Sequence, residues 1–164
     1  MERVQKKMNS SLNVLSESLD MKLSILSQLQ EYTDKQRAVW EADSPDIDEF
    51  DKLVDEKDQL VDRMISLDDG FEALYQDLSE DLQNNREKYT NQIKQLQDKI
   101  SAITEKSASI QAQEARNKKM IEEYFSKERQ GIKNNRVSSK AAYDYYKNMS
   151  GMNLQTSGFL DSKH

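Results

Sequence analysis

Apolar residues recur every three or four positions along most of the chain, which is the spacing that gathers them on one face of an α-helix. Over about residues 2–41 this face consists of Met8, Leu12, Leu15, Leu19, Leu23 and Leu26, with Gln30 as a polar continuation. Met21 and Ile25 widen the face, so the helix can contact more than one neighbour. The pattern predicts a long first helix over residues 2–41.

A second apolar stripe begins after the single proline. It consists of Phe50, Leu53, Lys57, Leu60, Met64, Leu67, Phe71, Leu74, Leu78 and Leu82. Ser44 is a suitable N-cap and Pro45 suits the first helical position, so we expect a short loop at residues 42–44 and a second helix over 45–83. Because so short a loop reverses the chain, the first two helices should form an antiparallel hairpin.

The stripe crosses a glycine at "SLDDGFE". Gly70 costs about 1 kcal/mol inside a helix, and Asp69 with Glu72 could form a capping box for a new one. The apolar phase nevertheless continues unbroken from Leu67 to Phe71. We therefore expect a continuous helix, or one with a kink at 68–70, and no reversal.

A sharper turn is expected at "LQNNREKY", where polar residues interrupt the stripe. The seam resumes in a third helix over 87–130 with Tyr89, Ile93, Leu96, Ile100, Ile103 and Ile110. This helix either folds back into a three-helix bundle or runs on as a coiled-coil rod. The pattern thus predicts an all-α protein: a long antiparallel hairpin extended to one of these forms over 1–132. Residues 133–164, rich in Ser, Asn and Gly, are expected to be a flexible C-terminal tail.

The composition supports long helices. Of 164 residues, 33% are charged and 35% hydrophobic, with only four glycines and one proline, too few for the frequent turns of a sheet protein. The net charge of −6 is uneven, with 16 acids against three bases in 41–81 and nine bases against four acids in 116–147. The basic excess is too weak for a nucleic-acid stripe. With neither a signal peptide nor a membrane span in the pattern, a cytoplasmic protein is expected.

No catalytic or metal-binding arrangement is found in the sequence. The chain has no cysteine, its one histidine is the terminal His164, and its four glycines are isolated. Thiolate, Ser-His-Asp and phosphate-loop chemistry therefore have no residues to use. The acidic run after Asp46 lacks the glycine of a calcium loop, because Asp51 stands at that position. We expect neither an enzyme nor a metal or cofactor site.

Lys57 stands inside an apolar stripe. Its helical neighbours are Leu53, Val54, Leu60 and Val61. In a hairpin centred near residue 43 or 44, Lys57 falls opposite Gln30 and Glu31. We expect its ammonium group to reach Glu31 or the Gln30 carbonyl and to fix the register of the hairpin. On this interpretation Lys57→Leu raises thermal stability and broadens the oligomeric state.

The end of the chain holds apolar residues with no obvious internal mate. The residues predicted to contact a partner are Met120, Ile121, Tyr124, Phe125, Ile132, Tyr143, Tyr145 and Tyr146, and Phe159 and Leu160 belong to the same surplus. Aromatic side chains on a mildly basic segment suit the binding of a partner helix or groove. The alternative is that Tyr124 and Phe125 cap the end of the bundle.

The segment "FDKLVDEKDQLVDRMISLDDGFEALY" resembles the central motif of the FlgN/FliT-like flagellar export chaperones, in which a lysine stands between spaced leucines. Leu53, Lys57, Leu60 and Leu67 match that pattern, and the segment "QEARNKKMIEEYF" places Asn117 and Ile121 at corresponding positions of a later helix. The resemblance covers about residues 8–148.

This resemblance implies a cytoplasmic chaperone for a type III secretion substrate. Such a chaperone binds the amphipathic C-terminal helix of a hook-associated, junction or filament-cap subunit, prevents premature assembly, and delivers the subunit to the flagellar export apparatus. It also implies that Asn117 contributes to partner binding and that a tyrosine near the C-terminus docks on the export gate. The client, and whether the chain is of FlgN or FliT type, stay open.

A second hypothesis is a structural homo-oligomeric coiled-coil protein without a client. It predicts a tight homodimer, and light scattering with and without candidate subunits separates the two.

Overall fold

The computed structural model describes residues 2–129, and these form three long helices connected by two tight turns. They are α1 (Glu2–Glu41), α2 (Ile47–Asn84) and α3 (Thr90–Glu128), with a short 3-10 helix, η1 (Arg86–Tyr89), before α3. The predicted tail at 133–164 lies outside the described residues.

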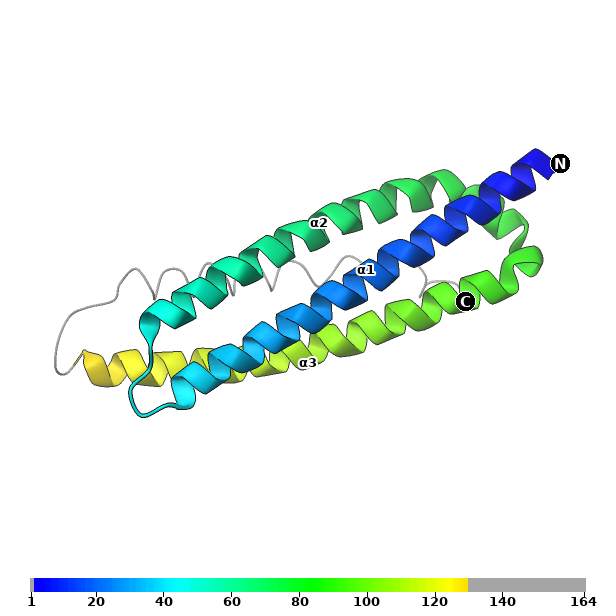
Figure 1. The fold of residues 1–164 in the computed structure, drawn as a ribbon. Helices are drawn as coiled ribbons and strands as arrows, with labels where there is room; N and C mark the ends of the chain where they lie inside the picture. Colours follow the sequence, from blue (N-terminus) through cyan, green and yellow to red (C-terminus); the bar gives the residue numbers. More distant parts are fainter. Residues whose placement is uncertain (1, 130–164) are drawn as a thin grey trace.

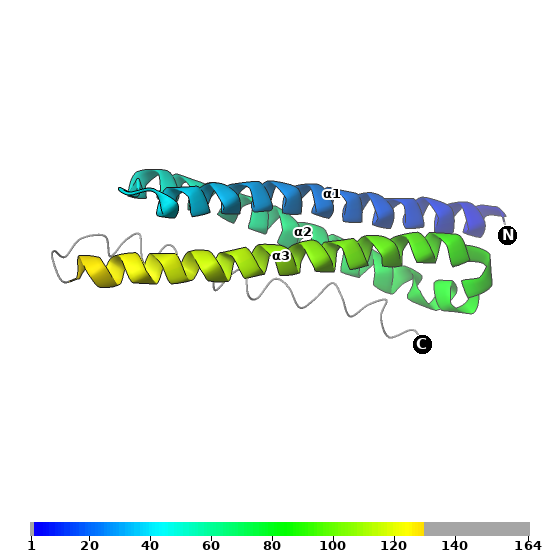
Figure 2. The same cartoon turned by 90° about the horizontal axis from the view of Figure 1, so that it is seen from below.

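The three helices form an elongated up-down-up bundle, with α2 antiparallel to α1 and α3 parallel to it (Figures 1 and 2). The parallel pairing is visible in two distant contacts. Lys99 donates to Ser16, 83 positions earlier, and Asn117 donates to the Thr33 carbonyl, 84 positions earlier. The third helix therefore folds back along the hairpin, and the rod alternative is wrong for this chain.

The loop between α1 and α2 ends differently from the expectation. The N-cap of α2 is Asp46, whose carboxylate accepts a hydrogen bond of 3.1 Å from the Glu49 backbone N–H. The prediction of Ser44 as the cap and Pro45 as the first helical residue is wrong. Aspartate caps a helix as well as serine does, and the cap at Asp46 leaves Pro45 in the loop, where its missing N–H costs nothing.

The second turn lies where polar residues interrupt the stripe. Asn85 closes α2, its backbone N–H and its side-chain amide both donating to the Asp81 carbonyl at 3.1 and 2.8 Å. One turn of 3-10 helix then leads into α3. By contrast, α2 passes through Gly70 without interruption, as the unbroken phase of the apolar stripe predicts.

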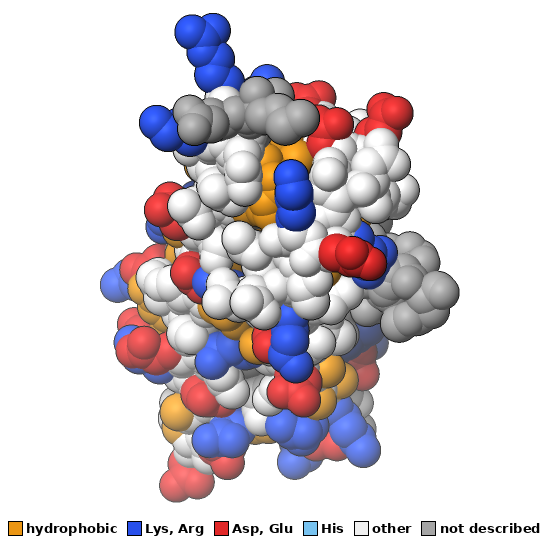
Figure 3. Space-filling view, turned by 90° about the vertical axis from the view of Figure 1, so that its right-hand side faces the viewer, with side chains coloured by type: hydrophobic (Ala, Val, Ile, Leu, Met, Phe, Trp, Pro, Cys, Tyr) orange, Lys and Arg blue, Asp and Glu red, His pale blue; other side chains and the backbone are white. Residues whose placement is uncertain are grey.

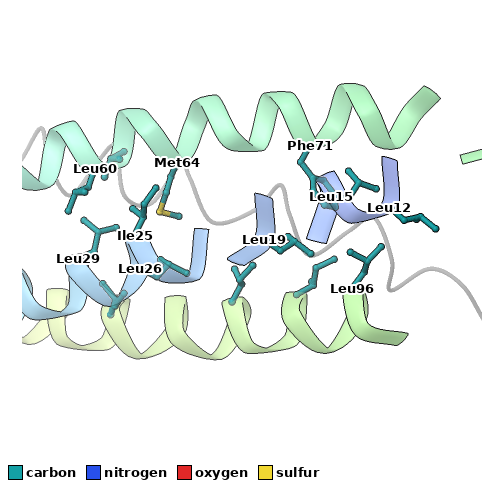
Figure 4. Close-up of a cluster of buried hydrophobic side chains, with 14 of the residues drawn as sticks. Leu12, Leu15, Leu19, Ile25, Leu26, Leu29, Leu60, Met64, Phe71 and Leu96 are labelled. Atoms are coloured by element: carbon teal, nitrogen blue, oxygen red, sulfur yellow. The ribbon is translucent and has the colours of Figure 1, made fainter. Parts of the chain in front are cut away.

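The core is a narrow seam of aliphatic side chains. In Figure 4, Met64 of α2 points toward Ile25 and Leu26 of α1, and Phe71 points toward Leu15. These residues are buried, as is Leu96 of α3 on the other side of α1. Burial of such side chains provides about 1.5–3 kcal/mol each, so the seam is the main source of stability.

The surface at the end near the N-terminus mixes both signs of charge. Figure 3 shows Lys and Arg side chains interspersed with Asp and Glu, and only small hydrophobic areas between them. No helix among residues 2–129 is long and apolar enough to cross a membrane.

Candidate functional site

The predicted register residue, Lys57, lies at the centre of a buried polar network that joins all three helices. Its side chain is completely buried, with 0% of its surface exposed. The Lys57 Nζ donates to Gln36 Oε1 of α1 at 2.5 Å and forms an ion pair with Glu114 of α3. Thr33 Oγ1 also donates to Glu114 Oε1, at 2.9 Å. One carboxylate therefore accepts hydrogen bonds from both other helices.

The network continues along α3 toward the surface. Asn117 Nδ2 donates to the Thr33 carbonyl at 3.1 Å, and Asn117 Oδ1 accepts from Gln113 Nε2 at 2.8 Å. Gln113 Oε1 in turn accepts from Arg116 Nη2 at 2.7 Å. Because Arg116 is exposed, the chain of hydrogen bonds runs from the core to the solvent.

Burial controls the protonation of the lysine. Removal from water lowers the pKa of Lys57 to about 8, although Glu114 and, to a smaller extent, Asp58 oppose the shift by favouring the charged form. The charged amine is thus held in an environment that costs free energy, and the carboxylate of Glu114 offsets part of that cost.

The predicted partners of Lys57 are wrong. Glu31 is on the outer side of α1, with 67% of its side chain exposed, and pairs with Lys35 at 3.5 Å. Gln30 is only half-buried, and its carbonyl is not an acceptor for Lys57 among the described residues. The prediction considered only the hairpin of α1 and α2. The acid that pairs with Lys57 comes instead from the third helix, α3.

An aromatic cluster lies beside the network, at the end of the bundle that holds the α1–α2 loop. The Trp40 ring of α1 makes edge contacts with Phe50 of α2 and Tyr124 of α3, at centroid distances of 5.2 and 5.1 Å. Phe125 joins them at 6.0 Å from Trp40. Two buried donors of α1, Gln36 Nε2 and Trp40 Nε1, have no hydrogen-bond acceptor among residues 2–129. The cluster fastens the C-terminal end of α3 to the hairpin.

The structure divides the predicted partner contacts into three groups. Asn117 and Ile121 are buried inside the bundle, so a partner reaches them only if α3 moves away from α1. Met120, Tyr124 and Phe125 are half-buried and keep part of their surface open. The remaining predicted contacts lie outside the described residues: Ile132, Tyr143, Tyr145 and Tyr146.

Three polar residues of the network lie at positions that continue the apolar stripes, although the predicted stripes did not include them. Thr33 and Gln36 continue the spacing of Leu26 and Leu29 toward Trp40, and Glu114 continues that of Ile103 and Ile110. Polar residues at apolar positions of all three stripes indicate a shared buried layer.

The arrangement offers structural rather than catalytic chemistry. Among residues 2–129 no three His, Cys, Asp or Glu side chains are placed to hold a metal ion. The charged pair is enclosed by the bundle, whereas Tyr124 and Phe125 are only half-buried. The accessible part of this region therefore suits contact with another protein.

Comparison with known protein families identifies the family of this chain. The FlgN family model, described as FlgN protein, matches residues 8–150. No curated protein and no solved structure matches the chain.

Proposed function

The chain belongs to the FlgN family of flagellar chaperones, and we propose that it is a cytoplasmic export chaperone for a type III secretion substrate. It binds the amphipathic C-terminal helix of a hook-associated, junction or filament-cap subunit. Binding keeps that helix from premature assembly until the subunit reaches the flagellar export apparatus.

The family match carries this proposal, because it extends over most of the chain and includes all of α2 and α3. The described surface is compatible with it. Met120, Tyr124 and Phe125 form a half-buried apolar and aromatic edge at the end of α3, and an edge of this kind can receive the apolar face of an added helix.

This edge gives the client a place to bind without dismantling the core. Trp40, which itself packs against Phe50, contacts Tyr124 and Phe125 from within, so the aromatic rings are pre-positioned before the client arrives. Pre-positioned side chains lose little conformational entropy on binding, and this favours affinity. Asn117 and Ile121 support the edge from the interior.

The proposal is tested by binding of C-terminal peptides from the hook-associated, junction and cap subunits of the same organism, measured by calorimetry with the full chain. We expect one of them to bind and Met120→Lys to weaken that binding at least about tenfold. Ser126→Lys is the matched control, because it adds the same charge at an exposed position of the same helix. Absence of binding by all of the peptides would overturn the proposal.

The three tyrosines of the C-terminal segment, Tyr143, Tyr145 and Tyr146, are proposed to contact the export gate. Replacing them one at a time by alanine, and then together, separates this role from client binding. We expect the triple variant to keep the client peptide but lose export of the client in cells. Normal export by the triple variant would contradict the assignment.

A further inference from the structure

One side of α2 borders the core and has a near-symmetrical arrangement about Gly70. Leu67 and Leu74 lie three residues before and four after it, and Arg63 and Asp77 lie seven residues before and after it. Spacings of three, four and seven place all five residues on the same side of a helix. Arg63, Gly70 and Asp77 are exposed and the two leucines are half-buried. We refer to these five residues as the Gly70 face.

The first helix adds apolar surface along one edge of the Gly70 face. Lys22 of α1 bonds to Asp68 of α2 at 2.6 Å, so the preceding residues, Met21 and Leu67, lie at the same level on the same side of the hairpin. Because α1 and α2 are antiparallel, we expect Val14 to lie near Leu74, one heptad further along. The side chains of Val14 and Met21 are 53% and 49% exposed. These two side chains add exposed apolar surface beside the leucines of the Gly70 face.

The glycine has no role within the described fold. A Cβ atom added at Gly70 meets no atom within 4 Å, so alanine would fit and would stabilise the helix by about 1 kcal/mol. The position instead offers bare backbone to the outside, which permits close approach of a second helix. The leucines on either side of it would pack around such a helix.

The two charged residues of the Gly70 face, Arg63 and Asp77, do not stabilise the bundle through side-chain contacts among the described residues. Neither Arg63 nor Asp77 forms an ion pair or a hydrogen bond through its side chain with any other described residue. They have opposite signs and stand at equal distances on either side of Gly70. A face with this pattern is complementary to itself when its direction is reversed.

We propose that a second copy of this chain docks on the Gly70 face, with the two α2 helices antiparallel and a two-fold axis passing beside Gly70. In such an isologous contact every pair occurs twice. Arg63 of each copy meets the partner's Asp77, Leu67 meets the partner's Leu74, and the two glycines allow the backbones to approach. The reversed charge pattern favours a second copy over an unrelated helix, whose charges would have no reason to match at both ends.

The first test uses the absence of cysteine from the chain. In Gly70→Cys the two introduced thiols lie next to the two-fold axis, and an added oxidant such as oxidised glutathione can join them as a disulfide. We expect Gly70→Cys to cross-link at least about tenfold faster than Asp98→Cys, a control at an exposed position of α3. Equal rates for the two variants would overturn the proposal.

The second test exchanges the charges and follows the molar mass by sedimentation velocity. Arg63→Glu and Asp77→Arg each place like charges together twice, so each should weaken the dimer at least about tenfold. The double variant Arg63→Glu/Asp77→Arg restores both pairs and should restore the dimer, and Asp98→Arg should leave it unchanged. A wild-type chain that stays monomeric at all concentrations, or a double variant no better than the single ones, would overturn the proposal.

Client binding provides an independent readout. The client edge proposed above is at the end of α3, so the monomeric Arg63→Glu variant should bind the client peptide as the wild type does. Loss of client binding with no change in molar mass would show that the Gly70 face receives the client helix and not a second copy. That result would overturn the dimer while leaving the chaperone function intact.

Discussion

The ammonium group of Lys57 and the carboxylate of Glu114 form a buried ion pair that connects α2 directly to α3. α1 is the helix that packs along both of these helices, so the pair supplies a direct link between the two outer ones. Gln36 of α1 accepts a hydrogen bond from Lys57, and Thr33 of α1 donates one to Glu114. The pair therefore fixes the axial register of the three helices relative to one another.

Lys57→Met is expected to destabilise the protein by about 3 kcal/mol, because the carboxylate of Glu114 then stays buried without its cation. This reverses the expectation from the sequence alone, in which an apolar residue at position 57 raises stability. Chemical denaturation monitored by circular dichroism measures the change. Lys94→Met, at an exposed position of α3, is the control and should change the free energy of unfolding by less than about 0.5 kcal/mol.

Removal of both charges should recover most of the loss. In Lys57→Met/Glu114→Leu no charge remains buried, and such replacements of buried ion pairs are often neutral or stabilising. A double variant less stable than Lys57→Met would mean that the pair contributes more through its hydrogen bonds than it costs in desolvation.

The low pKa of Lys57 predicts a pH dependence of stability. Burial lowers this pKa from 10.5 to about 8, so between these two pH values the unfolded chain holds a proton that the folded chain has released. The free energy of unfolding should therefore rise with pH across that window, by up to about 3 kcal/mol. Below pH 8 both states are protonated, and this contribution no longer changes.

The double variant Lys57→Met/Glu114→Leu isolates this effect from the other titrating groups. The free energy of unfolding of this variant should not show the rise attributed to Lys57. The difference in the free energy of unfolding between wild type and variant should therefore change between pH 8 and 10.5. Two curves that stay parallel over this range would show that Lys57 keeps its ordinary pKa in the folded protein.

Sequence periodicity was sufficient to predict the three helices, because each helix buries one stripe and the stripe is local. The partner of Lys57 could not be predicted in this way. Glu114 is 57 positions away, and the level at which it meets the lysine depends on the length and shape of the turn around η1. The polar residues at stripe positions, Thr33 and Gln36 in particular, indicated a layer but not which residues bond within it.

The start of α2 shows a second limit. Ser44 and Asp46 are both good caps, and the sequence alone does not say which one adopts the extended backbone of an N-cap. Pro45 favoured the earlier start because proline is common at the first helical position. The structure uses the later start and places Pro45 in the loop.

The observed cap gives a direct test. Asp46→Ala should cost about 1 kcal/mol, because the Glu49 N–H loses its acceptor, while Ser44→Ala should have little effect. Thermal unfolding of the two variants side by side makes the comparison. A larger loss for Ser44→Ala than for Asp46→Ala would place the cap where the sequence suggested.

Gly70→Ala is expected to raise the stability of the single chain by about 1 kcal/mol, because nothing obstructs the added methyl group. The measurement belongs in the Arg63→Glu background, where the proposed dimer is weakened and does not contribute to stability. Ala73→Gly, at an exposed position of the same helix, is the matched control and should lower stability by a similar amount. Destabilisation by Gly70→Ala would reveal a constraint on this backbone within the bundle itself.

The single tryptophan reports on the end of α3. Trp40 is buried and touches Tyr124 and Phe125, so its fluorescence depends on whether α3 is docked against α1 and α2. Tyr124→Ala should shift the emission of Trp40 to longer wavelength by admitting water. Tyr75→Ala, which removes a half-buried tyrosine stacked on Phe71 of α2, should leave the emission unchanged.

The same signal follows client binding without a label. A peptide that lies on the edge of Met120, Tyr124 and Phe125 should change the Trp40 emission in proportion to the bound fraction, and Met120→Lys should shift the titration to higher peptide concentration. If calorimetry detects binding while the Trp40 emission stays constant throughout, the client binds away from the end of α3. The proposed edge would then be wrong even though the chaperone function is retained.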